Sequence, residues 1–240
     1  MKKKNFKILL FIWLLPAMAC AQVASGKITY ERKTNLYKKF KNDNVREWIG
    51  EAEKIKIDYF ELYFNDSLTV FKSQESDLRE ENSWATQKNA VYQNLNSGSR
   101  ITRKSVWGEH VFLRDSTFVR KWKITESKRN IGGYDCRKAI WEINDSTRIY
   151  AWYTDALAVS TGPESFIGLP GVILGLATED GGVVYFATKI EVKSIPVESL
   201  IFKEKVKKYY SPDELRQQLQ KEYGKESWGK AMIKSVFDNW

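Results

Sequence analysis

Residues 172–192 read VILGLATEDGGVVYFATKIEV, and this stretch decides the fold. An apolar run at 172–176 is consistent with a buried strand. The acidic residues and paired glycines at 178–182 favour a tight reversal of the chain. After the reversal, apolar or β-branched residues recur at every second position: Val184, Phe186, Thr188, Ile190 and Val192. The stretch therefore predicts an antiparallel β-hairpin.

Period-two alternation marks five further runs, at 26–31, 55–59, 118–124, 139–143 and 149–153. β-branched and aromatic residues enrich these runs, as they do half-buried strands. Turns rich in Asp and Asn at 65–67, 114–116 and 144–146 favour hairpins between such runs. The alternating faces are Ile28 and Tyr30; Ile55, Ile57 and Tyr59; Phe118, Trp122 and Ile124; Ala139, Trp141 and Ile143; and Ile149, Ala151 and Tyr153. We expect a meander of antiparallel strands.

The pattern changes near the C-terminus. Ser211 and Pro212 form a helix start with acidic residues in its first turn, and Leu215 and Leu219 then recur on one face. Residues 227–240 could form another helix. The sequence thus predicts a mainly β fold: a single domain with a long curved antiparallel sheet, as a half-barrel or open barrel, and one or two C-terminal helices over its open face. A closed barrel or a two-sheet sandwich is the alternative.

The N-terminus reads as a targeting signal. Four lysines precede an apolar stretch at 8–19, which is too short to span a bilayer as a helix. We expect a signal peptide at 1–21 with cleavage near Ala21, one β-rich domain at 22–240, no transmembrane helix in the mature chain, and a periplasmic or secreted protein. Lipid anchoring at Cys20 is the minor alternative.

Composition excludes several classes of protein. A hydrophobic fraction of 42% with 14% aromatic residues is too high for a disordered chain. Removing residues 1–21 removes four lysines and no acids, so the formal charge falls from +9 to +5. Secretion and this mild charge argue against a nucleic-acid partner. One His and two Cys cannot build a multi-His or Cys₄ metal site, so we expect no metal and no cofactor.

Few residues could carry catalysis. Cys136 is the only thiol of the predicted mature chain, and His110 is the only imidazole that could activate it. Both are weak catalytic candidates, because a free Cys is more often a small buried hydrophobic residue. Five carboxylates lie near the Gly- and Pro-rich segment, and two of them could face each other for acid–base chemistry. They are Asp135, Asp155, Glu164, Glu179 and Asp180.

Residues 162–176, GPESFIGLPGVILGL, contain four Gly and two Pro between large apolar residues. A phosphate-binding loop would need Lys and Ser or Thr after its last Gly, whereas Val172 and Ile173 follow Gly171. Pro fixes the backbone φ angle and Gly relaxes it, so this segment has a particular irregular path. We expect a buried turn that leads into an apolar strand.

This segment, GLPGVI at 168–173, resembles the name-giving motif of the GLPGLI family of secreted bacterial proteins. The elements GYDCRKA at 133–139, AWYT at 151–154 and GP at 162–163 match further family elements in the same order. The resemblance implies a cell-envelope protein and brings no known activity. The residues that carry it are Gly133, Tyr134, Cys136, Lys138, Trp152, Tyr153, Gly162, Pro163, Gly168, Leu169, Pro170 and Gly171.

Aromatic residues suggest what the domain does. If the sheet does not close, its aromatic side chains can line an apolar cleft. We therefore expect a periplasmic binding or accessory module for an apolar or peptide ligand, or for an outer-membrane protein partner. The alternative is a thiol- or carboxylate-dependent enzyme, or a redox protein, that uses Cys136. The aromatic residues are Trp107, Trp122, Trp141, Trp152, Tyr134, Tyr150 and Tyr153.

Overall fold

A computed structural model describes residues 24–74, 82–106, 108–144 and 147–237. Residues 1–21, where we predict a signal peptide with Cys20, and Trp107 lie outside the described residues, so the inferences drawn from them stay predictions. Among the described helices, none is long and apolar enough to cross a membrane.

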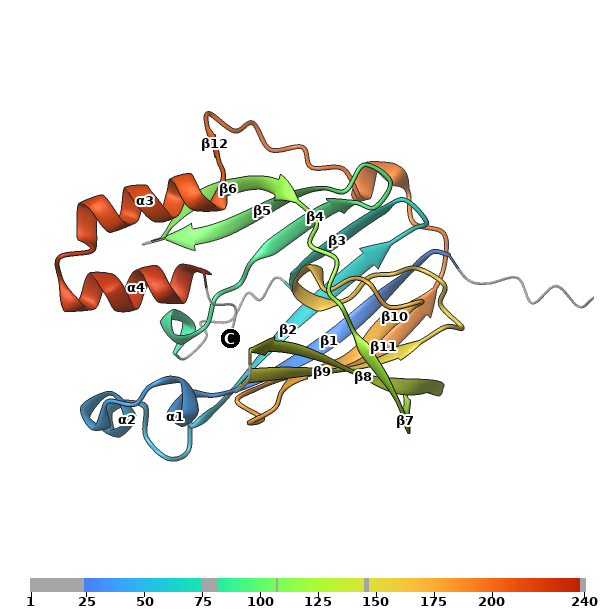
Figure 1. Cartoon of the computed structure of the whole chain (residues 1–240), viewed down its shortest axis with the longest axis horizontal. Helices are drawn as coiled ribbons and strands as arrows, with labels where there is room; N and C mark the ends of the chain where they lie inside the picture. The colour runs from blue at the N-terminus through green and yellow to red at the C-terminus, as the bar shows by residue number, and fades with distance from the viewer. Residues whose placement is uncertain (1–23, 75–81, 107, 145–146, 238–240) are drawn as a thin grey trace, which may run out of the picture.

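The described residues form one open sheet in the order β12-β6-β5-β4-β3-β2-β1-β11-β10-β9-β8-β7 (Figure 1). Neighbouring strands are antiparallel, except that the short β12 runs parallel to β6. The predicted mainly β fold with a long antiparallel sheet is confirmed, and the described strands form one open sheet rather than a closed barrel or two separate sheets. The strands are β1 Gly26–Asn35, β2 Ile55–Phe64, β3 Leu68–Ser73, β4 Ala90–Asn94, β5 Ser99–Val106, β6 Glu109–Ser116, β7 Lys123–Ile131, β8 Tyr134–Asn144, β9 Thr147–Thr154, β10 Val172–Thr178, β11 Val183–Val192 and β12 Tyr209–Tyr210.

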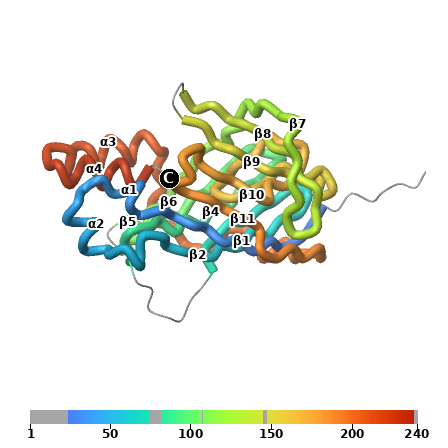
Figure 2. Tube along the Cα trace, turned by 90° about the horizontal axis from the view of Figure 1, so that it is seen from below, coloured from blue at the N-terminus to red at the C-terminus, as the bar shows by residue number. Residues whose placement is uncertain are grey.

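Two C-terminal helices are present, as predicted. Helix α3 (Pro212–Tyr223) starts at Ser211, whose side chain accepts from the backbone N–H of Glu214 while the Glu214 carboxylate accepts from the Ser211 N–H. Helix α4 (Ser227–Phe237) packs against α3, and both bury apolar side chains against β5 and β6. The sequence did not predict α1 (Leu36–Lys39) and α2 (Asp43–Ile49), which follow β1 and lie at the same end of the molecule (Figures 1 and 2).

The hairpin of β10 and β11 forms as predicted, but the buried face of β11 is the other one. Val183, Tyr185 and Ala187 are buried, whereas Thr188 and Val192 are exposed. Because side chains alternate between faces, an assignment that is off by one residue exchanges the two faces completely.

The same inversion occurs in β2, with larger consequences. The apolar face Ile55, Ile57 and Tyr59 is exposed, and the charged Lys56 and Asp58 are buried. They share their face with Phe60, Leu62 and Phe64, which are fully buried at the other end of the strand and determine which face points inward. The charged side chains of Lys56 and Asp58 therefore lie on the buried face of the sheet.

Two local predictions are wrong. Residues 117–122 form no strand, because β7 begins only at Lys123 and the preceding segment packs its aromatic side chains onto residues 163–168. Residues 114–116 form no turn: they end β6, where Asp115 stands opposite Arg100 of β5 and pairs with its guanidinium. The opposite charge of Arg100 explains why an acidic residue lies within a strand here.

The segment between β9 and β10, residues 155–171, is the motif loop. It folds back over the sheet, so that its short 3₁₀ helix η2 (Pro163–Ser165) contacts β3 and β4 (Figure 1). Phe166, Leu169 and Val172 join the main hydrophobic core. The predicted buried turn leading into an apolar strand is confirmed, since Val172 to Ala177 of β10 are all buried.

Candidate functional site

Two glycines let the motif loop approach its neighbours closely. Gly171 has φ 157°, and a Cβ there would stand 1.9 Å from the backbone oxygen of Thr154. Gly168 has φ 102°, and a Cβ would stand 2.9 Å from the backbone oxygen of Arg120. Backbone atoms cannot move away as flexible side chains can, so these positions require Gly. The two glycines of the GLPG segment thus have a structural role, because they let the motif loop pack closely against the backbone at Thr154 and Arg120.

Glu164 ties the motif loop to the sheet. Its side chain is 1% exposed, and its backbone adopts the left-handed conformation at φ 50°. The Tyr185 hydroxyl donates to Oε1 at 2.9 Å, and Asn89 Nδ2 donates to Oε2 at 3.2 Å. Arg32 Nη1 stands 3.9 Å from Oε1. The unusual backbone conformation is held in place by these contacts from β1, β11 and the segment before β4.

A buried ion pair lies next to Glu164. Arg32 Nη2 stands 2.6 Å from Asp58 Oδ2, and neither side chain is more than 3% exposed. Thr86 Oγ1 donates to the same carboxylate at 3.0 Å, and Lys56 Nζ is 3.5 Å from Oδ1. The Arg32 guanidinium also lies 4.6 Å from the centre of the Phe60 ring. We call Arg32, Lys56, Asp58, Glu164 and Tyr185 the buried charge network.

The surroundings of Asp58 and Tyr185 shift the pKa of each group. Burial alone would raise the pKa of Asp58, but Arg32, Lys56 and the Thr86 hydroxyl outweigh it and lower the pKa. Burial raises the pKa of the Tyr185 phenol well above its ordinary value. Asp58 therefore stays ionised and Tyr185 stays protonated near neutral pH. These two groups are poorly suited to proton transfer and well suited to anchoring the motif loop.

An open pocket with aromatic side chains lies next to the motif loop. A cavity of about 360 Å³ is lined by Phe118, Val119, Lys121, Lys123, Ile140, Trp141 and Glu142. We call it the aromatic pocket. Phe118 is 55% exposed and Val119 is 63% exposed. Its Trp141 ring lies 5.9 Å from Phe166 of the motif loop, and Trp122 Nε1 donates to the Ile167 oxygen at 2.9 Å. The motif loop thus supports the back of the pocket.

A second, smaller cavity of about 210 Å³ lies at the helical end, between α1, α4 and the 3₁₀ helix η1 (Ser83–Ala85). Thr86 and Gln87 line it and also bond the buried charge network, through Asp58 and Arg32 respectively. Trp84 also lines it, and the Trp84 ring lies 5.1 Å from that of Trp48 at an interplanar angle of 41°.

Comparison with known proteins identifies the family. The family model described as "N-glycanase peptide, N-terminal domain" matches residues 36–216. The chain belongs to this family. A search of curated proteins found no match.

Solved structures agree with this N-glycanase N-terminal domain assignment at the level of the fold. Two crystal forms of PNGF-II match with TM-scores of 0.52 and 0.54, at 20% and 18% sequence identity. The matches cover 75% and 89% of this chain, but only 30% and 33% of the PNGF-II chains. The chain thus spans about a third of the proteins that it resembles.

In this N-glycanase N-terminal domain, Cys136 lacks the features of a nucleophile. It is 1% exposed, and its Sγ lies 3.5 Å from the Tyr134 oxygen in its own strand. Burial, and then the Asp135 charge, raise the pKa of the Cys136 thiol to about 11. His110 is exposed on β6, and eight strands separate β6 from β8 in the sheet order. No contact between Cys136 and His110 is present.

The carboxylates that the sequence singled out do not form a pair. Only Glu164 is buried, whereas Asp135, Asp155, Glu179 and Asp180 are exposed. Glu179 accepts from Arg148 Nη1 at 3.0 Å on the surface. No cluster of three or more potential metal ligands occurs within the described ranges.

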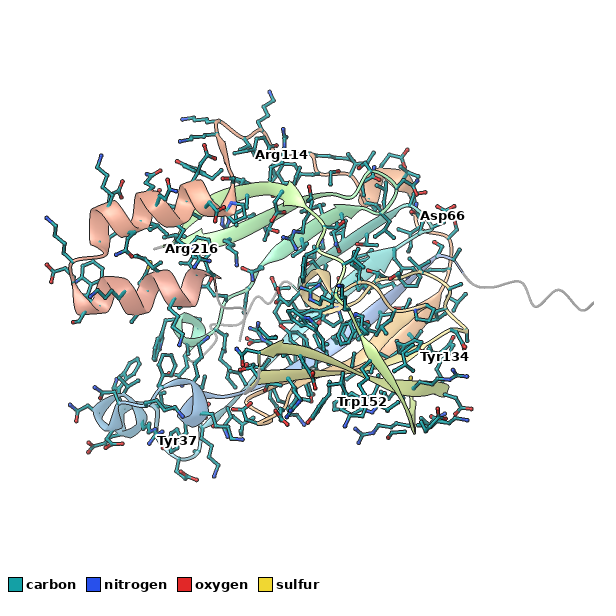
Figure 3. All side chains as sticks on the ribbon, in the orientation of Figure 1. Tyr37, Asp66, Arg114, Tyr134, Trp152 and Arg216 are labelled. Atoms are coloured by element: carbon teal, nitrogen blue, oxygen red, sulfur yellow. The ribbon has the colours of Figure 1, made fainter. Side chains whose placement is uncertain are left out.

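The remaining family-motif residues shape the strands β7 to β9. Gly133 has φ 86° in the turn between β7 and β8. Lys138 Nζ lies 3.9 Å from the Tyr150 ring centre, and Trp152 packs on Phe186 at 5.9 Å. Figure 3 places Tyr134 and Trp152 at the end of the molecule away from Tyr37 and Arg216.

The residues that sequence reasoning missed are Arg32, Asp58 and Tyr185. Arg32 continues the inward face of Ile28 and Tyr30, and Asp58 that of Phe60 and Leu62, so extending each face by one position would have found them.

Proposed function

We propose that the chain is a non-catalytic binding module of the cell envelope, of the GLPGLI type, periplasmic or secreted, that holds an apolar or peptide ligand in the aromatic pocket. One observation carries the proposal: the 360 Å³ pocket leaves Phe118 and Val119 more than half exposed above a Trp141 floor. Pockets of this size and composition are typical of small-ligand sites.

The energetics support binding at this pocket. Fully burying a Phe or Val side chain contributes roughly 1.5–3 kcal/mol. A ligand that covers Phe118 and Val119 would recover a part of that. The pocket is also preorganised, because Trp141 packs on Phe166 and Trp122 is hydrogen-bonded to the motif loop. A preformed site spends little of the binding free energy on ordering side chains.

The buried charge network supports a structural role for Glu164 of the motif loop, since its side chain is buried and hydrogen-bonded on both oxygens. The buried Cys136 thiol and the distant His110 likewise favour binding over thiol chemistry.

The family membership is compatible with this role. The chain matches a family model for an N-terminal domain and covers 33% of a PNGF-II chain, so it corresponds in length to one part of that longer chain. We therefore favour an extended peptide segment as the ligand, presented to an enzyme or to an outer-membrane partner that acts beside this module.

Native mass spectrometry of the protein purified from its own envelope tests the proposal. We expect a bound species on the wild type and its loss in Phe118→Ser, because this substitution removes an exposed wall of the pocket. Trp228→Ser is the matched control, since Trp228 is 53% exposed but lies on α4. An adduct that survives Phe118→Ser, or its absence from repeated wild-type preparations, would contradict the proposal.

A further inference from the structure

The rim of the aromatic pocket carries two lysines. Lys121 and Lys123 line the pocket, and neither forms an ion pair with a described residue. Some basic residues elsewhere find acidic partners, such as Lys27 with Glu61 at 2.7 Å and Arg103 with Glu204 at 2.9 Å. Others, such as Lys128 and Lys203, form no ion pair with a described residue, so Lys121 and Lys123 are distinguished by lining the pocket.

One acidic side chain lines the pocket, and it is already engaged. Arg148 Nε lies 3.3 Å from Glu142 Oε1, and Arg148 Nη1 lies 3.0 Å from Glu179. The Glu142 charge is thus partly neutralised by Arg148 and cannot balance both rim lysines. The lining of the pocket has a net positive charge.

A third cation stands behind the pocket wall. The Arg120 guanidinium lies 3.8 Å from the Phe166 ring centre and 5.0 Å from that of Trp141, and Nη1 donates to the Ser165 oxygen at 3.1 Å. Its partners are aromatic rings and backbone oxygens, and Nε is buried without a hydrogen-bond partner. Burial, and then the charge of Arg100, lower the pKa of Arg120. Its positive charge is therefore costly as the pocket stands, and a nearby anion would offset that cost.

We propose that the occupant of the aromatic pocket is an amphipathic carboxylate: an apolar chain or ring that covers Phe118, Val119 and Trp141, with a carboxylate facing Lys121 and Lys123. This rests on the proposed function and specifies its ligand. The same chemistry comes from two sources, a free acyl acid or the carboxy terminus of an apolar peptide. Apolar contacts supply the affinity and the lysines select for charge.

Isothermal titration of the mature chain with two matched pairs of probes tests this. One pair is decanoate and decan-1-ol, and the other is acetyl-Ala-Leu-Phe as the free acid and as the amide. Each pair keeps the apolar body and removes the charge. The pair that binds also identifies the source, acyl acid or peptide terminus.

The variant is Lys121→Ala/Lys123→Ala, and the matched control is Lys128→Ala/Lys203→Ala, which changes the net charge equally with exposed lysines that do not line the pocket. We expect at least one acid to bind about tenfold more tightly than its neutral partner, the change expected from two partly exposed ion pairs. The rim variant loses this preference and the control keeps it. Added salt weakens binding of the acid more than that of the neutral probe.

Two results would overturn the inference. In the first result, the acid and neutral probes bind equally, and binding depends on Phe118 but not on the rim lysines. The ligand is then apolar and uncharged, so the proposed binding function stands and the inference of a carboxylate ligand fails. If none of the four probes binds to the wild type, both the carboxylate and the binding role of the pocket fail.

Discussion

Asp58→Asn tests whether the buried charge network holds the fold together. The substitution keeps the shape of the side chain and removes its charge, which leaves Arg32 buried with only Glu164, at 3.9 Å, as a compensating anion. Breaking a buried ion pair by removing one partner costs about 3–5 kcal/mol. Since Glu164 remains nearby, we expect the lower end, about 3 kcal/mol of unfolding free energy. For a domain of this size that lowers Tm by about 6–12 °C.

The effect also has a predicted pH dependence. The pKa of Asp58 is lowered in the folded state, so its contribution is fully present above the unfolded pKa of about 4 and is lost as pH falls through the folded value. The stability difference between wild type and Asp58→Asn should therefore be constant near neutral pH and shrink below about pH 4.

Equilibrium urea unfolding, followed by tryptophan fluorescence at several pH values, measures both effects. Asp155→Asn is the matched control: Asp155 is exposed, and we expect a change within about 0.5 kcal/mol. A loss below about 1 kcal/mol for Asp58→Asn at neutral pH, or a difference that persists unchanged into acid, would refute the assignment of a stabilising buried pair.

Three further predictions concern the motif loop and the thiol. Gly171→Ala should cost more than about 3 kcal/mol in urea unfolding, because its Cβ would meet the Thr154 backbone oxygen, whereas Gly108→Ala, with open space around it, should cost only about 1–2 kcal/mol; equal costs would argue against the clash. Glu164→Gln should lower the unfolding free energy by about 1–3 kcal/mol and speed proteolysis within 155–171, since a charged hydrogen-bond acceptor becomes neutral; unchanged proteolysis would count against the anchoring role. Cys136 should resist a disulfide reagent at pH 8 in the native protein and react fully in urea, because its pKa is raised to about 11; rapid native reaction would reopen the thiol-enzyme hypothesis.

The sequence predicted the fold class because local pattern determines it here. The alternation in β1 and β9 and the helix start at Ser211 are set by neighbouring residues, and the structure confirms them. Residues 117–122 were assigned wrongly because their aromatic side chains pack on the motif loop, some 45 residues later in the chain. Such a long-range contact has no local signature.

The candidate site was predicted only in part. Trp141 is one of seven aromatic residues that the sequence names, and it lines the aromatic pocket. Glu164 is one of five carboxylates that the sequence names for acid–base chemistry, and it anchors the motif loop instead of pairing with another of the five. Arg32 and Asp58 were missed because charged residues are rarely buried unless paired, and the partner of each lies on another strand. In β2 the sequence pattern at Ile55 and Ile57 predicts that this face is buried. The face that carries Phe60, Leu62 and Phe64 is longer, and it determines which side chains of the strand point inward.

The most direct test of the binding role is to locate a ligand on the aromatic pocket by NMR. The indole N–H signals of a protein that comprises residues 22–240 are assigned by substitution, and decanoate or the acetyl-Ala-Leu-Phe acid is added. We predict that the Trp141 signal shifts in a saturable way, because Trp141 lines the pocket, while those of Trp48 and Trp228, exposed at the helical end, stay in place. A saturable shift at Trp48 or Trp228 with Trp141 unchanged would contradict the account.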